Sequence, residues 1–210
     1  MKRFMGFALA IAGTTLVPQY MSAHFRLLAP DSAIEENNLG DPQKIGPCGG
    51  TSANAKGPAN PGTPTGAITK VTGGQKLHIK VQETVYHPGH YRISLAVNSR
   101  AELPADPEVV TRDDAKGPQS VSAAIMSTLK PPVLVDGLWA HNTRESAANP
   151  WETDITLPNI NCAKCTLQII QFMAEHGRNK DGDFSYHHCA DLSITADASK
   201  PVDRTWPGQR

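Results

Sequence analysis

The sequence lacks the features typical of nucleic-acid-binding and membrane proteins. Its 20 Lys and Arg residues are balanced by 20 Asp and Glu residues, so it has no basic field for nucleic acid and no polybasic patch for a membrane surface. After residue 23, no apolar run is long enough for a membrane anchor. Aromatic residues make up only 6% of the chain, so its three tryptophans do not by themselves predict a sugar-stacking platform.

The first 23 residues are typical of a secretory signal peptide. Lys2 and Arg3 form a positive start, an apolar run follows, and the small residue Ala23 precedes His24. The apolar run is too short and too interrupted to span a bilayer. Cleavage after Ala23 would make His24 the first residue of a protein that is secreted or periplasmic. The mature chain would then carry 18 basic and 20 acidic residues, since Lys2 and Arg3 are removed.

All four cysteines lie in the predicted mature chain. In an oxidising compartment they predict two disulfides, and four cysteines allow three pairings. We expect Cys48–Cys189, which would tie a long loop to the last strand, and Cys162–Cys165 as a local bridge. The alternative is a zinc site built from Cys162-x-x-Cys165 with His187, His188 or Cys189.

Alternation of apolar and polar residues predicts two β-strands in the first half of the mature chain. Residues 77–86 and 91–97 both alternate, and His87-Pro88-Gly89-His90 between them predicts a hairpin with a type II turn and histidines at its tip. A short helix is possible at residues 120–129. Residues 31–65 are rich in Pro, Gly, Asn and Ser and predict a long functional loop. Further strands are expected at residues 133–135, 153–157, 165–173 and 188–196.

Many short strands, long loops and the absence of a convincing amphipathic helix favour an all-β antiparallel sandwich. We expect this domain to cover residues 24–198, followed by a C-terminal tail at 199–210. His78 and His141 are expected to be solvated or hydrogen-bonded rather than metal ligands.

An N-terminal histidine can bind a metal in a way that no internal histidine can. Its α-amine and its imidazole Nδ1 together chelate one ion, and a third nitrogen from a distant histidine gives a set that suits Cu(II). Three separated parts of the chain could meet in such a site. They are His24, His87 in Tyr86-His87-Pro88-Gly89, and Tyr186 in Tyr186-His187-His188-Cys189.

These motifs, in this order, resemble the lytic polysaccharide monooxygenases, which are copper enzymes with an immunoglobulin-like β-sandwich. The resemblance is spread over most of the mature chain and looks closest to bacterial monooxygenase-like proteins. It implies an immunoglobulin- or fibronectin-III-like sandwich, copper bound by the "histidine brace" of His24 and His87, and Tyr186 on the axial side of the metal. The Cys162-x-x-Cys165 segment followed by Cys189-Ala190-Asp191 is similar to the fungal and animal branches of the family.

One departure from the family bears on the site. In a large branch, a glutamine two residues before the axial tyrosine contacts an oxygen species, and here that position is Phe184. Glu175 is a candidate for the role in its place. His90, His176 and His188 are candidates for groups around the metal ligands. His87 is favoured over His90 as the ligand because the following proline restricts its backbone and because it matches the family's His-x-Gly setting.

The resemblance implies a secreted monomer that oxidatively cleaves a polysaccharide with copper and an external electron donor. The alternative is a secreted protein that binds or delivers copper without oxidative chemistry.

Overall fold

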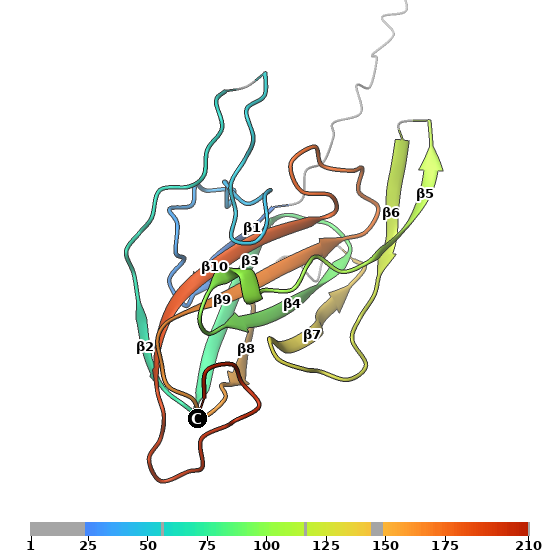
Figure 1. Ribbon diagram of the computed structural model, residues 1–210. Helices are drawn as coiled ribbons and strands as arrows, with labels where there is room; N and C mark the ends of the chain where they lie inside the picture. Colours follow the sequence, from blue (N-terminus) through green and yellow to red (C-terminus); the bar gives the residue numbers. More distant parts are fainter. Residues whose placement is uncertain (1–23, 56, 116, 144–148, 210) are drawn as a thin grey trace, which may run out of the picture.

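The computed structural model (Figure 1) describes residues 24–55, 57–115, 117–143 and 149–209, so the predicted signal peptide lies outside the described residues. Regular structure in this part of the chain consists of ten strands and one short 3₁₀ helix, η1 (Arg100–Glu102). The strands are β1 (His24–Ala29), β2 (Thr69–Thr72), β3 (Lys76–Val85), β4 (Gly89–Ala96), β5 (Val109–Asp114), β6 (Gly117–Ala123), β7 (Val133–His141), β8 (Trp151–Thr156), β9 (Cys162–Met173) and β10 (Ser185–Thr195).

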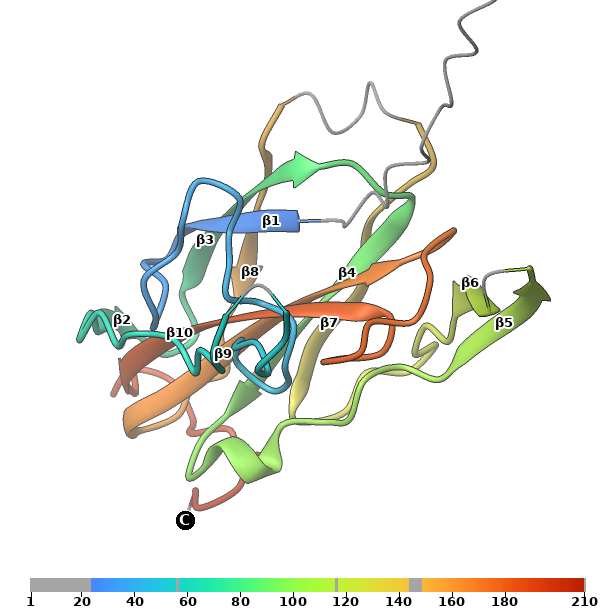
Figure 2. The same cartoon turned by 90° about the horizontal axis from the view of Figure 1, so that it is seen from above.

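The strands form two facing sheets and a projecting ribbon. One sheet has the order β1-β3-β8 and the other β2-β10-β9-β4-β7. Figure 2 shows the first lying above the second, while β5 and β6 pair with each other and extend away from both. The predicted all-β sandwich is therefore confirmed. One pairing departs from an antiparallel arrangement, because the long loop returns β2 alongside β10 in the parallel direction.

Inward-facing residues of both sheets make one apolar core, as the period of two along each strand dictates. From the three-stranded sheet come Phe25 of β1 and Ile79 of β3, both fully buried. From the five-stranded sheet come alternate residues of β4, β9 and β10, namely Tyr91, Ile93, Leu95, Cys165, Leu167, Ile169, Met173, Tyr186, Ala190, Leu192 and Ile194.

The predicted hairpin of residues 77–97 is wrong. β3 and β4 follow one another in the sequence but belong to different sheets, so the chain crosses between the two layers at residues 86–88. A type II turn would need a positive φ at Gly89. Gly89 is not among the positive-φ glycines of the described chain and instead begins β4. A Cβ atom there would lie 1.9 Å from the carbonyl oxygen of Phe172, so the close approach of β4 to β9 requires glycine.

The possible helix at residues 120–129 is also wrong, since residues 117–123 form β6. Tertiary contacts decide this segment. The Ser120 hydroxyl donates to the carbonyl oxygen of Met173 at 2.6 Å and accepts from the backbone N–H of His176 at 3.1 Å. The β5–β6 ribbon is thereby tied to the end of β9.

Both expected disulfides are present, Cys48–Cys189 and Cys162–Cys165, and the described chain has no free cysteine. The first joins the long loop to β10 across 141 positions of sequence. No thiolate is left to bind zinc, so the structure does not support the zinc alternative.

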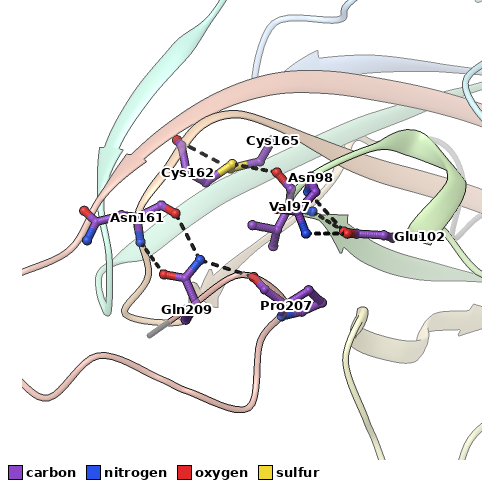
Figure 3. The surroundings of a disulfide bond; sticks show 8 residues. All are labelled: Val97, Asn98, Glu102, Asn161, Cys162, Cys165, Pro207 and Gln209. Carbon is purple, nitrogen blue, oxygen red and sulfur yellow. Dashed lines mark hydrogen bonds between the residues drawn. A yellow bond between two sulfur atoms is a disulfide. The ribbon is translucent and has the colours of Figure 1, made fainter.

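The segment after residue 198 packs onto the sandwich rather than leaving it. Trp206 is buried and belongs to the apolar core. Figure 3 shows Gln209 beside Asn161 and the Cys162–Cys165 disulfide, and the Gln209 side chain accepts from the Asn161 N–H at 2.9 Å. Residues up to 209 are therefore structurally part of the domain.

Candidate metal centre

Three histidines and one tyrosine lie close together near the start of β1. Figure 2 shows that β1 begins at the same end of the sandwich as the β3–β4 and β9–β10 connections. The ring centroids of His24 and Tyr186 are 5.4 Å apart. The ring of His176 lies 4.8 Å from that of His87 and 6.3 Å from that of Tyr186. Tyr186 is fully buried and the three histidines are nearly so. The structure thus brings together His24, Tyr186 and His87, with His176 between Tyr186 and His87. These four side chains are called the ring cluster below.

Strand pairing explains how residues so distant in sequence meet. In the β1–β3 ladder, His24 lies opposite Val85, which places the start of β1 two residues from His87. Tyr186 is the second residue of β10 and points into the core. His176 follows β9, and two hydrogen bonds join its backbone to Ser120 of β6. The His176 N–H donates to the Ser120 hydroxyl, and the His176 carbonyl oxygen accepts from the Ser120 N–H at 3.0 Å.

His176 is neutral at ordinary pH. Burial, reinforced by the nearby charge of His87, lowers its pKa to about 4. Its Nδ1 lies 2.5 Å from the carbonyl oxygen of Gly177 and must donate to it. The proton of the neutral ring is therefore on Nδ1, and Nε2 carries a lone pair.

A buried carboxylate lies behind the histidines. The Glu83 side chain has no exposed surface, and its Oε1 accepts from the Tyr91 hydroxyl at 3.3 Å and from the side-chain amide of Gln171. The Nε2 atom of His141 lies 2.9 Å from the same oxygen. Gln171 stands directly opposite Tyr186 in the β9–β10 ladder, so this polar network adjoins the ring cluster.

His141 connects that carboxylate to the backbone of His87. Its Nε2 is 2.8 Å from the carbonyl oxygen of His87, and its Nδ1 is 2.7 Å from the carbonyl oxygen of Trp139. Burial alone would lower the pKa of His141, but the bonds to Glu83 and to the two carbonyls raise it. Both ring nitrogens face acceptors, which favours the protonated ring and holds the backbone at His87 in place. The expectation that His141 is hydrogen-bonded is confirmed.

His188 supports β1 from the core side rather than facing the ring cluster. Its Nε2 donates to the carbonyl oxygen of Phe25 at 2.9 Å, and its Nδ1 lies 3.1 Å from Glu36. Burial lowers the pKa of His188 to about 4 and raises that of Glu36 to about 7. Burial thus holds His188 as a neutral imidazole at ordinary pH.

Two of the candidate residues lie elsewhere. Glu175 is exposed and forms an ion pair with Arg112 of β5, because the β5–β6 ribbon lies beside the end of β9. His90 lies on the opposite face of β4 from the core residue Tyr91, and its ring packs 5.2 Å from that of Phe172. These contacts do not support the expected roles of Glu175 and His90 beside the ligands, which remain predictions.

Glu83 and Gln171 were not predicted as site residues, although the sequence carries a signal for both. Glu83 continues the inward row of Leu77, Ile79 and Val81, and Gln171 continues that of Leu167 and Ile169. A polar residue in an apolar row predicts a buried hydrogen-bonded group. Asp41, whose carboxylate lies 3.3 Å from His24 Nε2, gave no such signal because it is in an irregular loop.

The donors present suit a nitrogen-ligated metal. Among the described residues, no three His, Cys, Asp or Glu side chains are close enough together to form a metal site. A histidine brace needs only two side chains, because its third nitrogen is the amine that cleavage before His24 would create. Imidazole and amine nitrogens favour Cu(II) over Ca²⁺ or Mg²⁺, which prefer oxygen.

No protein-family model matches the chain, and no curated protein matches it. Among solved structures, the fold is similar to that of a chitin binding domain from Burkholderia pseudomallei, at 13% identity and a TM-score of 0.43, over 83% of this chain and 100% of that one. It is also similar to Cel61B from Hypocrea jecorina, a glycoside hydrolase family 61 member, at 12% identity and a TM-score of 0.38, over 69% of this chain and 58% of that one. Likenesses this distant carry no argument about function.

Proposed function

We propose that the protein is an exported copper enzyme that cleaves polysaccharide oxidatively. The observation that carries the proposal is the ring cluster at one end of the sandwich. His24, the residue that signal cleavage would expose, lies there with its ring against Tyr186, and His87 reaches the same cluster through His176. A chelating N-terminal histidine and a second imidazole are the donors that a histidine brace requires.

Each residue of the cluster has a task in this proposal. His24 binds the ion through its amine and Nδ1, and His87 provides the third nitrogen. The buried ring of Tyr186 packs beside His24 on the side of the core and excludes water there. His141 holds the backbone of His87 through its carbonyl oxygen, which limits where the His87 ring can point.

The chemistry would come from the bound metal. Copper, reduced by an external electron donor, supplies the one-electron chemistry that activates O₂ or H₂O₂ for abstraction of a hydrogen next to a glycosidic bond. The chain would supply the donor geometry, a dry inner wall and the neutral imidazole of His176 beside the donors.

Export is supported by the two disulfides, which persist in oxidising compartments. No helix in the described part of the chain is long and apolar enough to cross a membrane.

The direct test is to incubate copper-loaded protein beginning at His24 with a panel of glycans and a reductant, and to analyse the products by mass spectrometry. We expect oxidised oligosaccharides from at least one glycan, and none from a His87→Ala variant. Tight copper binding without oxidised products from any glycan would contradict the enzymatic proposal and leave copper storage or delivery as the function.

A further inference from the structure

The long loop replaces a neighbouring strand along the outer edge of β1. In its sheet, β1 pairs with β3 alone. On the other edge, the N–H of Phe25 donates to the side-chain oxygen of Gln43 at 3.1 Å, and the N–H of Leu27 donates to the Glu36 carboxyl group at 3.1 Å. Side chains of residues 36–43 thus satisfy the backbone donors next to His24, which ties this loop segment to the first residues of the predicted mature chain.

The same segment places one carboxylate on the His24 ring. Oδ2 of Asp41 lies 3.3 Å from His24 Nε2, and the His24 side chain is almost completely buried. The Asp41 carboxylate is therefore placed as an acceptor that faces a ring nitrogen able to donate.

Asp41 is itself held in place by the loop. Its N–H donates to the side-chain oxygen of Asn37 at 3.0 Å, and its carbonyl oxygen accepts from the Asn37 N–H at 3.0 Å. The preceding residue, Gly40, has a φ of +98°, and a Cβ there would meet the Phe25 carbonyl oxygen at 1.9 Å. Only glycine lets the loop approach β1 closely enough for the Asp41 carboxylate to reach His24.

The two ring nitrogens of a histidine are distinct, and a hydrogen bond at one decides what the other can do. An acceptor at Nε2 keeps the proton there and leaves the lone pair on Nδ1. Nδ1 is the nitrogen that can share an ion with the α-amine of the same residue. A carboxylate at Nε2 therefore selects the chelating form of the ring and fixes its orientation.

We propose that Asp41 is a positioning residue, carried by the segment 36–43, which keeps the proton of the His24 imidazole on Nε2 so that Nδ1 carries the lone pair that can bind a metal ion. The inference rests on the proposed copper-binding role of His24, and it adds the long loop to the parts of the chain on which that role depends. Asp41 acts through His24 and is not itself a ligand.

The test compares Asp41→Ala, Asp41→Asn and the control Asp31→Ala, each in protein that begins at His24. Asp31 is an exposed carboxylate of the same loop, so its removal changes the net charge equally. We expect Asp41→Ala to bind Cu(II) about tenfold more weakly in calorimetry and to show a broadened or shifted Cu(II) EPR spectrum, as loss of a carboxylate partner of a ligating histidine typically does. Asp41→Asn retains an acceptor oxygen and should restore most of the affinity, and Asp31→Ala should match the parent protein.

A second measurement separates this inference from the proposed function. In metal-free protein, the ¹⁵N NMR signals of the His24 ring should show a protonated, hydrogen-bonded Nε2, and Asp41→Ala should remove that signature. If the parent protein shows the signature but binds no copper, the proposed function is wrong and the contact is real. If Asp41→Ala leaves the ring signals, the EPR spectrum and the affinity unchanged, the positioning role is wrong, whether or not copper binds.

Discussion

At the scale of single residues, burial keeps the imidazole of His176 in the candidate centre neutral. Its pKa is about 4 in the folded chain against an ordinary value near 6.5. A neutral ring keeps its lone pair, which is the form in which histidine can accept a hydrogen bond or bind a metal. The same burial makes the fold sensitive to acid.

The first prediction concerns His176 and pH. Between about pH 6.5 and pH 4 the unfolded chain binds a proton at this residue that the folded chain does not, so the free energy of unfolding falls as the pH falls. We expect metal-free parent protein to lose on the order of 3 kcal/mol more than His176→Asn between pH 7 and pH 4, since each pKa unit corresponds to about 1.4 kcal/mol. Urea unfolding at a series of pH values measures both. Equal losses in the two proteins would mean that His176 titrates normally in the fold.

The second prediction distinguishes the two histidines that flank Pro88-Gly89. His87 joins the ring cluster, whereas His90 packs against Phe172 on the other face of β4. In protein beginning at His24, His87→Ala should lose the three-nitrogen pattern in the Cu(II) EPR spectrum and most of the affinity. His90→Ala should retain both. The reverse result would assign the third nitrogen to His90 and would require the chain near Gly89 to rearrange when metal binds.

At the scale of elements, the centre depends on how the long loop is fastened to the five-stranded sheet. The Cys48–Cys189 disulfide joins that loop to β10 three residues after Tyr186. Close by, the backbone N–H of His187 donates to the carbonyl oxygen of Gln43 at 2.8 Å, and the Gln43 side chain in turn holds the N–H of Phe25. The loop, β10 and β1 are thus linked within a few residues of the ring cluster.

The third prediction concerns the contribution of the Cys48–Cys189 disulfide to stability. Replacing Cys48 and Cys189 together with serine should lower the free energy of unfolding by about 3–5 kcal/mol, because the bridge closes a long segment of the unfolded chain. The matched control replaces Cys162 and Cys165, which close a segment of only a few residues, and should cost about 2 kcal/mol in the same chain-entropy estimate. Denaturant unfolding with the disulfides intact provides the reference. A larger loss in the control pair would show that the short bridge is the more important one for stability.

At the scale of the whole molecule, the sequence predicted the layers better than the connections. The mostly apolar segment 165–173 predicted β9, and all of these residues are buried because the strand lies in the middle of the five-stranded sheet. The alternation in β3 and β4 could not tell that the two strands enter different sheets, since period two specifies which face is buried and not which strand is the partner. The helix expected at 120–129 failed for a related reason, because Ser120 is held by contacts with the end of β9.

The candidate centre was likewise predictable only in part. His24, His87 and Tyr186 were chosen from the sequence, and the fold brings them to one end of the sandwich. Glu175 was chosen from its place after a strand, yet its side chain points away to Arg112. Asp41 approaches His24 through the path of a long irregular loop, and no local pattern encodes that path.

The measurement that tests the central claim most directly is calorimetric titration of Cu(II) into two forms of the whole protein. One form begins at His24, and the other retains Ala23 before it, so that the nitrogen of His24 is an amide. We predict that the first binds one Cu(II) tightly and the second much more weakly, because only the first offers the amine and Nδ1 of the same residue. Affinity of the first form should also fall at lower pH, since the amine and the imidazoles must lose their protons to bind. Equal affinity for the two forms would contradict a metal centre built on His24.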